Sequence, residues 1–441
     1  MMIKADRKTG LVFFPAFDWA IDPTHPEREE RLLYTQDQVF EEGLFDIEGI
    51  TEFKPDLVTH EDIRRVHFCA PDIESVTTES HLISAGGAVT VAKAVMEGAV
   101  EKGFALVRPP GHHAMRVVHG NRGFCNINIE AIMIEYLRAK HGVRRVAVVD
   151  TDCHHGDGSQ DIFWHDPDTL FISIHQDGRT LYPGSGFIEE LGGPNALGTT
   201  VNIPLPPLTS DEGYLWTVEN VVMPILEDFK PEIIINSAGQ DNHFSDPLTN
   251  MNFSARGYAD LTDMLSPDIA VLEGGYSIEG ALPYVNTGII LALAGLDYTG
   301  IKEPGFDAAR IAQPPDVTRQ VRQIGQAVLS TWRQREALQA KLVGNHKTVS
   351  RRRNIMYDTD MIYEMQIDEI TVCRECKGAL KVDSSSDTGH HLFGVHIPNG
   401  VCPACRAKAE QWFEESKNGP YTLRTMQDLD SQTFYDEPRE V

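Results

Sequence analysis

Five short apolar runs, each followed immediately by polar residues and glycines, constrain the fold of this chain more than any other feature. Near-continuous apolar runs of this length are typical of strands that are buried on both faces of a sheet. Most of the stretches between them are long enough for a crossover helix, which two parallel strands require. The pattern therefore predicts an α/β fold with a largely parallel sheet. The five runs are residues 104–107, 146–149, 170–174, 233–236 and 269–272.

The segments that follow these runs carry the residues best suited to chemistry. They contain two adjacent histidines, an acidic loop with two more histidines, an aspartate shortly after a glycine, and a tyrosine after two glycines. In open α/β sheets, ligands bind outside the carboxyl ends of the strands. The repetition predicts one functional site at this edge of the sheet. The segments are residues 108–113, 150–158, 175–186, 237–241 and 273–276.

The loop that begins at Asp150 is a candidate metal site. Asp152 and His154 alternate with other residues, so an extended backbone would point both side chains to one side. Carboxylate and imidazole groups are ligands for zinc and related divalent metals. Taken alone, this pattern also fits an acidic loop that caps a strand, and the loop by itself does not decide between the two.

The cysteines favour a second metal site. Cys373-Arg-Glu-Cys376 and Cys402-Pro-Ala-Cys405 form two Cys-x-x-Cys pairs with glycines and a Pro-Asn-Gly turn between them. This spacing is typical of a zinc ribbon. The remaining three cysteines stand apart, which fits reduced thiols better than a disulfide framework.

Charge and hydropathy restrict the partners. The formal net charge of −26 argues against non-specific binding to nucleic acid or anionic membranes, and it favours cationic ligands. No apolar run reaches the length that spans a bilayer, and no apolar signal region follows Met1. We therefore expect a cytoplasmic protein without membrane or nucleic-acid partners.

Residues 8–300 resemble the histone deacetylase family, in particular its bacterial and class II-like members. The resemblance implies an arginase/deacetylase-like open, mainly parallel sheet with helices on both faces. The motifs that carry it occur in the family's order: His25-Pro-Glu-Arg28, Arg108-Pro-Pro-Gly-His-His-Ala114, Gly123-Phe-Cys125, Asp150-x-Asp-x-His-His-Gly-Asp157, Ser237-Ala-Gly-x-Asp241, Asp246-Pro247 and Leu272-Glu-Gly-Gly-Tyr276.

The resemblance implies a zinc-dependent amidohydrolase site. Asp152, His154 and Asp241 would hold a catalytic Zn²⁺ and leave positions open for water and substrate. His112 and His113 would be backed by Asp150 and Asp157 respectively, with His113 as the principal general base and acid. Tyr276 would donate a hydrogen bond to the developing oxyanion.

The same resemblance implies a narrow substrate channel. Phe124 and Tyr182 would form its aromatic walls, with Gly123 and Gly275 beside them, and aromatic faces suit a methylene stem. Tyr182 stands where phenylalanine is usual in the family. A K⁺ site around Asp150, Asp152 and His154, with Ser173 nearby, is also implied.

We expect four parts along the chain. These are a deacetylase catalytic domain at 1–310, a helical linker at 311–365, a zinc ribbon at 366–415 with a structural Zn²⁺, and an acidic tail at 416–441 without fixed structure. The ribbon is either a structural clip or a module that docks a protein partner or another subunit.

The predicted function is hydrolysis of acetyl-lysine, or another acyl-lysine, in proteins or peptides. The alternative within the enzyme class is an amidohydrolase for acetylpolyamines or other small cationic amides. An arginase-like binuclear manganese enzyme would need a further carboxylate pair, and Asp241-Asn-His-Phe-Ser-Asp246 lacks the Asp-x-Asp form. A non-catalytic protein-binding scaffold is opposed by the complete catalytic set.

Overall fold

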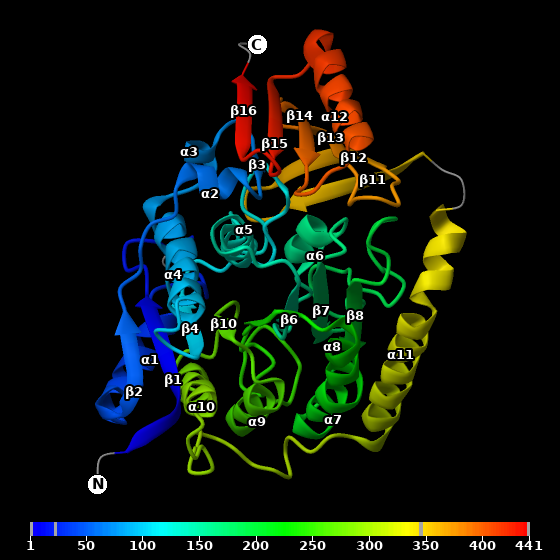
Figure 1. Ribbon diagram of the computed structural model, residues 1–441. Coiled ribbons are helices and arrows are strands. Elements are labelled where there is room, and N and C mark those ends of the chain that lie inside the picture. The colour runs from blue at the N-terminus through cyan, green and yellow to red at the C-terminus, as the bar shows by residue number, and fades with distance from the viewer. Residues whose placement is uncertain (1–2, 22–23, 344–346, 439–441) are drawn as a thin grey trace.

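An eight-stranded parallel sheet forms the centre of the molecule (Figure 1). The computed structural model describes residues 3–21, 24–343 and 347–438. The strand order is β2-β1-β4-β10-β9-β6-β7-β8, and every neighbouring pair is parallel. The strands are β1 Lys4–Phe14, β2 Glu48–Phe53, β4 Lys102–Val107, β6 Val146–Asp150, β7 Thr169–Gln176, β8 Thr200–Leu205, β9 Ile233–Ser237 and β10 Ile269–Val271.

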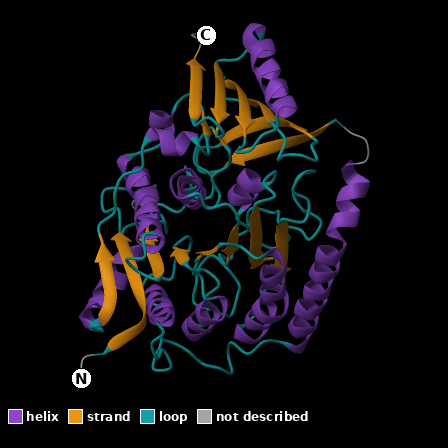
Figure 2. Ribbon diagram, in the orientation of Figure 1, coloured by secondary structure: helices purple, strands orange, loops and turns teal. Residues whose placement is uncertain are grey.

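Helices cover both faces of this sheet, as Figure 2 also shows. Side chains along a strand alternate between the two faces, so Ala147 and Val149 join one apolar cluster, whereas Val146 and Val148 join the other. The first cluster contains residues of α1 Glu30–Glu41, α7 Asp211–Thr217, η2 Val218–Val222, α8 Met223–Phe229, α9 Ala255–Leu265, α10 Leu282–Ala294 and α11 Pro315–Val343. The second contains residues of α2 His60–Arg64, α3 Ile73–Val76, α4 Glu79–Met96, α5 Ile129–His141 and α6 Asp157–Phe163.

This arrangement confirms the predicted α/β class with a mainly parallel sheet and helices on both faces. The chain also forms a short helix, η1 Leu44–Asp46, and a two-stranded sheet of β3 Phe68–Cys69 and β5 Val117–Val118. Among the described helices, none is both long enough and apolar enough to cross a membrane.

A second sheet of six strands forms a layer above α5 and α6 in Figure 1. Its inner face packs on the first domain, because Ile370, Leu380 and Val382 share an apolar cluster with Phe68 and Val117. Its outer face carries α12 Pro403–Glu415, which is followed by η3 Ser416–Asn418. In sheet order the strands are β11 Thr348–Tyr357, β12 Ile362–Thr371, β13 Leu380–Ser386, β14 His391–Ile397, β15 Leu423–Asp428 and β16 Thr433–Pro438.

The structure differs from the expected linker and tail. The long helix α11 ends at Val343, and residues 348–357 are a strand rather than part of a helical linker that reaches 365. The acidic tail is not unstructured, because residues 423–438 supply β15 and β16. These residues are ordered because β15 pairs with β14 and β16 pairs with β15. Acidic residues of β16 also have cationic partners: Glu437 pairs with the buried Arg424, and Asp436 with Arg64. Residues 347–438 therefore form one six-stranded unit that includes the four cysteines.

Candidate active site

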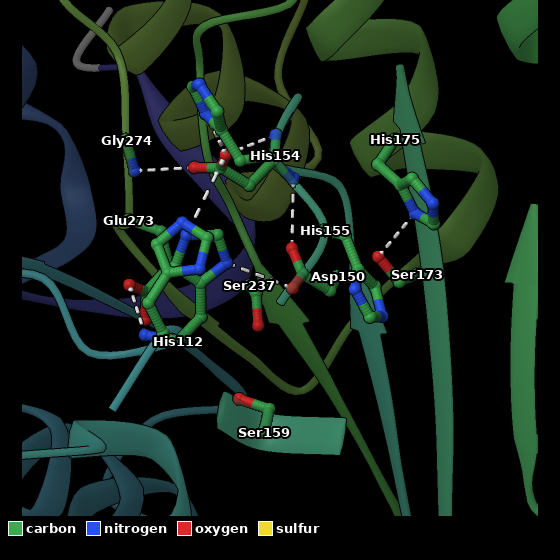
Figure 3. A network of polar contacts seen from close by, with 12 residues as sticks. His112, Asp150, His154, His155, Ser159, Ser173, His175, Ser237, Glu273 and Gly274 are labelled. Atoms are coloured by element: carbon green, nitrogen blue, oxygen red, sulfur yellow. Dashed lines mark hydrogen bonds and ion pairs between the residues drawn. The ribbon is translucent and has the colours of Figure 1, made fainter. Parts of the chain in front are cut away.

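The carboxyl ends of four adjacent strands bring the predicted site residues together. The strands β4, β10, β9 and β6 are neighbours in that order. Strand β4 leads into the segment with His112 and His113, and β10 leads into the segment with Tyr276. Strand β9 leads into the segment with Asp241, and β6 into the segment with Asp152 and His154. Figure 3 shows His112, Asp150 and His154 close together, with Glu273 and Gly274 beside them. The parallel topology explains this convergence, because equivalent ends of parallel strands lie at one edge of the sheet.

Asp152, His154 and Asp241 form a compact cluster of ligand atoms. One ligand atom from each residue lies within 4.8 Å of the other two. His154 Nδ1 is 3.1 Å from Asp152 Oδ1 and 2.8 Å from Asp241 Oδ2. Both carboxylates are fully buried. The second oxygen of Asp152 accepts a hydrogen bond from the N–H of Gly274 at 2.7 Å, and that of Asp241 accepts one from the N–H of Cys153 at 2.6 Å. The unit is therefore held rigidly by the backbone.

The chemistry of this cluster suits a divalent cation. Two buried carboxylates face one imidazole. Burial lowers the pKa of His154, but the nearby carboxylates of Asp241 and Asp152 outweigh this effect and raise that pKa to about 10. The site thus attracts positive charge strongly. One nitrogen and two oxygen donors form the mixed ligand set that zinc accepts, and three protein ligands are typical of catalytic zinc. The residues fit the predicted metal.

The two adjacent histidines occupy different electrostatic surroundings. His112 Nδ1 lies 3.1 Å from Asp150 Oδ2, and His113 Nδ1 lies 2.8 Å from Asp157 Oδ1. Burial works against charge on His112, yet Asp152 and Asp150 raise the pKa of His112 well above its ordinary value. Burial and the neighbouring His112 lower the pKa of His113 to about 3. A cation at the cluster would weaken the effect of Asp152, because it would balance that carboxylate's charge.

Tyr276 is held in place by its backbone and its ring. Its N–H donates to Asp246 Oδ2 at 2.8 Å, and the Arg31 guanidinium lies 5.0 Å from the centre of its ring. Burial raises the pKa of Tyr276 well above its ordinary value, so its hydroxyl remains a hydrogen-bond donor. Gly275 adopts a φ of +128°, and its carbonyl accepts a hydrogen bond from Arg31 at 2.7 Å.

Two aromatic rings lie beside the catalytic candidates. The Phe124 ring packs edge-on against Tyr276 at 5.8 Å between centroids, and the Tyr182 ring packs edge-on against His113 at 5.2 Å. Gly123 has a φ of +52°, and a Cβ at this position would lie 2.4 Å from His113 Cδ2. Only glycine therefore permits the loop before Phe124 to lie directly on the His113 ring.

Comparison with known proteins shows the family of the chain. Residues 71–291 match the histone deacetylase domain. A probable deacetylase of Archaeoglobus fulgidus is 45% identical over 325 residues, which cover 67% of this chain and 89% of the relative. The chain belongs to the histone deacetylase family.

Two further similarities support hydrolase activity and the fold of this deacetylase-family chain. A histone deacetylase-like amidohydrolase of Pseudomonas aeruginosa is 35% identical over 241 residues, which cover 53% of this chain and 62% of the relative. The crystal structure of the HDA15 HD domain has a TM-score of 0.64 and 27% identity, and the match covers 77% of this chain and 99% of that one. These relatives fit the predicted bacterial, class II-like type of deacetylase.

The four predicted zinc-ribbon cysteines also meet. The ligand atoms of Cys373, Cys376, Cys402 and Cys405 lie within 4.8 Å of one another, and Cys373 Sγ is 3.8 Å from Cys402 Sγ. A tetrahedral site with zinc–sulfur distances of about 2.3 Å has edges of about 3.8 Å. The cluster is therefore compatible with a structural zinc site in the deacetylase-family chain, outside residues 71–291.

The roles of two residues around the site were not predicted from the sequence. Glu273 Oε2 accepts the N–H groups of Gly111 and His112, and it fixes the backbone of the histidine pair. Arg122 donates to Asp157 Oδ2 from Nε at 3.0 Å. Glu273 lies inside the Leu272-Glu-Gly-Gly-Tyr276 motif, which was the one signal that could have identified it.

The implied K⁺ site stays a prediction. Ser173 Oγ lies 2.9 Å from His175 Nδ1, and both residues are buried at the end of β7 (Figure 3). Ser173 pairs with Asp150 across strands β7 and β6, which accounts for its position near the metal loop.

Metal counting on two variants provides a first test. We expect two zinc ions per wild-type chain. Gly274→Ala should lose the catalytic ion and at least 100-fold in activity, because the added Cβ would lie 2.5 Å from both Asp152 Oδ2 and Asp241 Oδ2. Cys402→Ser should instead lose the ribbon ion and keep the catalytic one. The two variants control for each other, and loss of the same ion from both would contradict the assignment.

Proposed function

We propose that this deacetylase-family protein is a zinc-dependent deacylase that hydrolyses the side-chain amide of acyl-lysine in proteins or peptides. The observation that carries the proposal is the convergence of the Asp152–His154–Asp241 cluster, the His112–His113 pair and Tyr276 at one sheet edge. Hydrolysis of an amide needs a polarised carbonyl, an activated water and a proton for the leaving amine. The three groups together can meet all three needs.

A bound Zn²⁺ would supply Lewis acidity towards the water and the carbonyl oxygen. Asp152, His154 and Asp241 would hold it, and a backbone N–H group fixes the second carboxylate oxygen of each aspartate. In this arrangement the ligands themselves do not take part in proton transfer.

His113 is the proposed general base and acid. Asp157 faces its Nδ1, so Nε2 is the nitrogen available for proton transfer. We infer that Nε2 takes a proton from the attacking water and later gives it to the leaving amine. Arg122 and His113 hold the pKa of Asp157 below its usual range even though burial opposes this, so Asp157 stays a carboxylate that orients the ring.

His112 and Tyr276 are proposed to stabilise charge. His112 lies between the carboxylates of Asp150 and Asp152, with Nε2 3.8 Å from Asp152 Oδ1. When a cation balances the charge of Asp152, the Asp150 carboxylate at 3.1 Å from Nδ1 still favours a cationic ring. Tyr276 would donate its hydroxyl hydrogen to the oxyanion that forms from the substrate carbonyl. The Phe124 and Tyr182 rings would pack on either side of the methylene stem of the lysine.

A substrate panel tests the function. Zinc-loaded protein should hydrolyse acetyl-lysine peptides faster than acetylputrescine, with short and long acyl chains compared on the same peptide. Faster turnover of acetylputrescine would instead favour the acetylpolyamine alternative, whose cationic substrates the net charge of −26 suits equally. Failure to hydrolyse any amide would refute the proposal.

A further inference from the structure

The turn between β11 and β12 lies directly on the loop that precedes Phe124. This turn belongs to the C-terminal six-stranded sheet and lies outside the residues that match the deacetylase domain. Asp358 Oδ1 accepts the backbone N–H of Gly123 at 3.1 Å, and Asp360 Oδ2 accepts the N–H of Asn121 at 2.6 Å. Two acidic side chains of one turn therefore bind alternate residues of one active-site loop.

Asp358 also contacts the opposite aromatic wall. The hydroxyl of Tyr182 donates to the same Oδ1 atom at 2.8 Å. Gly123 and Tyr182 are 59 residues apart in the chain, yet one carboxylate oxygen joins them. Because Gly123 precedes Phe124, Asp358 links the segments that carry both proposed walls of the substrate stem. Tyr182 can make this bond only because it has a hydroxyl, which the usual phenylalanine lacks.

Strand β11, which leads into this turn, is linked to the acid–base pair through Arg122. The carbonyl of Met356 accepts a hydrogen bond from Arg122 Nη1, and Arg122 donates to Asp157 Oδ2 from its other nitrogens. The Arg122 guanidinium also lies 5.6 Å from the centre of the Tyr182 ring. Residues 356–358 thus contact Arg122, which binds the carboxylate that orients His113, and Tyr182, whose ring packs against His113.

We propose that Asp358 is a positioning residue of the active site, which the C-terminal sheet supplies to fix the spacing of Tyr182 and the Gly123–Phe124 turn. This inference rests on the proposed function, because it assigns those two segments to the substrate stem. Asp358 acts through them rather than on the substrate. The C-terminal sheet is then part of the catalytic unit of this protein, rather than only a clip or a docking module.

Attachment of the two domains does not depend on Asp358. The domains are joined by the apolar contacts of Phe68 and Val117 with the inner face of the sheet, and by ion pairs from Arg351 and Arg353 to Asp161 on α6. Removing the Asp358 side chain should therefore leave the sheet in place. Its effect would report on the aromatic walls alone.

The test compares Asp358→Ala with Asp358→Asn in the full-length, zinc-loaded protein. Asp358→Ala leaves the Gly123 N–H and the Tyr182 hydroxyl without their acceptor, which should lower kcat/KM for an acetyl-lysine peptide by about tenfold to a hundredfold, mainly through KM. Asparagine keeps an acceptor oxygen for both donors, so Asp358→Asn should retain activity within about threefold. In a Tyr182→Phe background, where one donor is already missing, Asp358→Ala should cost no more than about threefold.

Asp383→Ala is the matched control. Asp383 also accepts a tyrosine hydroxyl, from Tyr421 at 3.0 Å, but within the C-terminal domain. This variant should leave KM unchanged. Equal kinetic effects of Asp358→Ala and Asp383→Ala, or a full effect of Asp358→Ala in the Tyr182→Phe background, would overturn the proposal.

Hydrogen exchange separates this inference from the proposed function. Asp358→Ala should speed amide exchange in segments 120–126 and 180–186, and Asp358→Asn and Asp383→Ala should not. If the wild-type protein hydrolyses no acyl-lysine peptide, the proposed function fails, whereas the exchange result still tests the position of Asp358. Unchanged exchange in both segments of Asp358→Ala would overturn the positioning role itself.

Discussion

Tyr276→Phe should lower kcat for an acetyl-lysine peptide by about 10²-fold to 10³-fold, the range seen when one oxyanion donor is removed. The ring should stay in place, because its contacts with Phe124 and the Arg31 guanidinium do not involve the hydroxyl. Within the described chain, no residue forms a hydrogen bond with that hydroxyl, so its removal should not destabilise the fold. Steady-state kinetics and thermal unfolding of the variant measure the two effects separately.

Tyr421→Phe serves as the control for the loss of a tyrosine hydroxyl. That hydroxyl donates to Asp383 in the C-terminal domain, and its removal should leave kcat unchanged. A kcat for Tyr276→Phe within about threefold of the wild-type value would remove Tyr276 from the mechanism. A large fall in the unfolding temperature would instead indicate a structural role.

His113→Ala should lower kcat by about 10²-fold to 10⁴-fold, the usual contribution of a general acid–base group. The zinc content should not change, because the Asp152–His154–Asp241 cluster does not include this ring. Added imidazole should restore part of the activity, since the missing side chain leaves space next to Asp157. Rates, metal content and the response to imidazole are the measurements.

His112→Ala distinguishes the two histidines. We expect His112→Ala to lower kcat less than His113→Ala and to show no rescue by imidazole. The reason is that His112, which lies between Asp150 and Asp152, is proposed to stabilise charge in the reaction and not to transfer the proton. A larger loss or a stronger rescue in His112→Ala would reverse the roles assigned here. Retention of full activity in both variants would contradict acid–base catalysis by this pair.

The structure also changes how the C-terminal region should be studied. Deleting residues 366–441 would remove five of the six strands of the sheet, either wholly or in large part. It would also leave β11 without its partner and Phe68 and Val117 without their apolar cover. Loss of activity after such a deletion would not distinguish catalysis from folding. Single replacements such as Asp358→Ala avoid this difficulty because they leave the apolar contacts intact.

Much of the fold and of the candidate site follows from local sequence patterns. Apolar runs followed by glycine and polar residues indicate parallel strands, because strands that are covered on both faces need apolar side chains throughout. Asp152 and His154 are close in sequence, so their shared direction needs only a short extended backbone. The four cysteines are equally readable, because a Cys-x-x-Cys pair brings its two sulfurs together locally.

The long-range partners were decided by the tertiary structure alone. Arg122 and Asp157 meet because α6 packs against the loop after β5, and Tyr182 and Asp358, which are 176 residues apart, meet because the C-terminal sheet covers that loop. The strands within the expected tail were not predicted for the same reason. Glu437 and Asp436 pair with Arg424 and Arg64 only in the packed molecule. Local pattern sets which strand or loop a segment becomes. Which segments then touch depends on how whole sheets pack, and no short stretch of sequence contains that information.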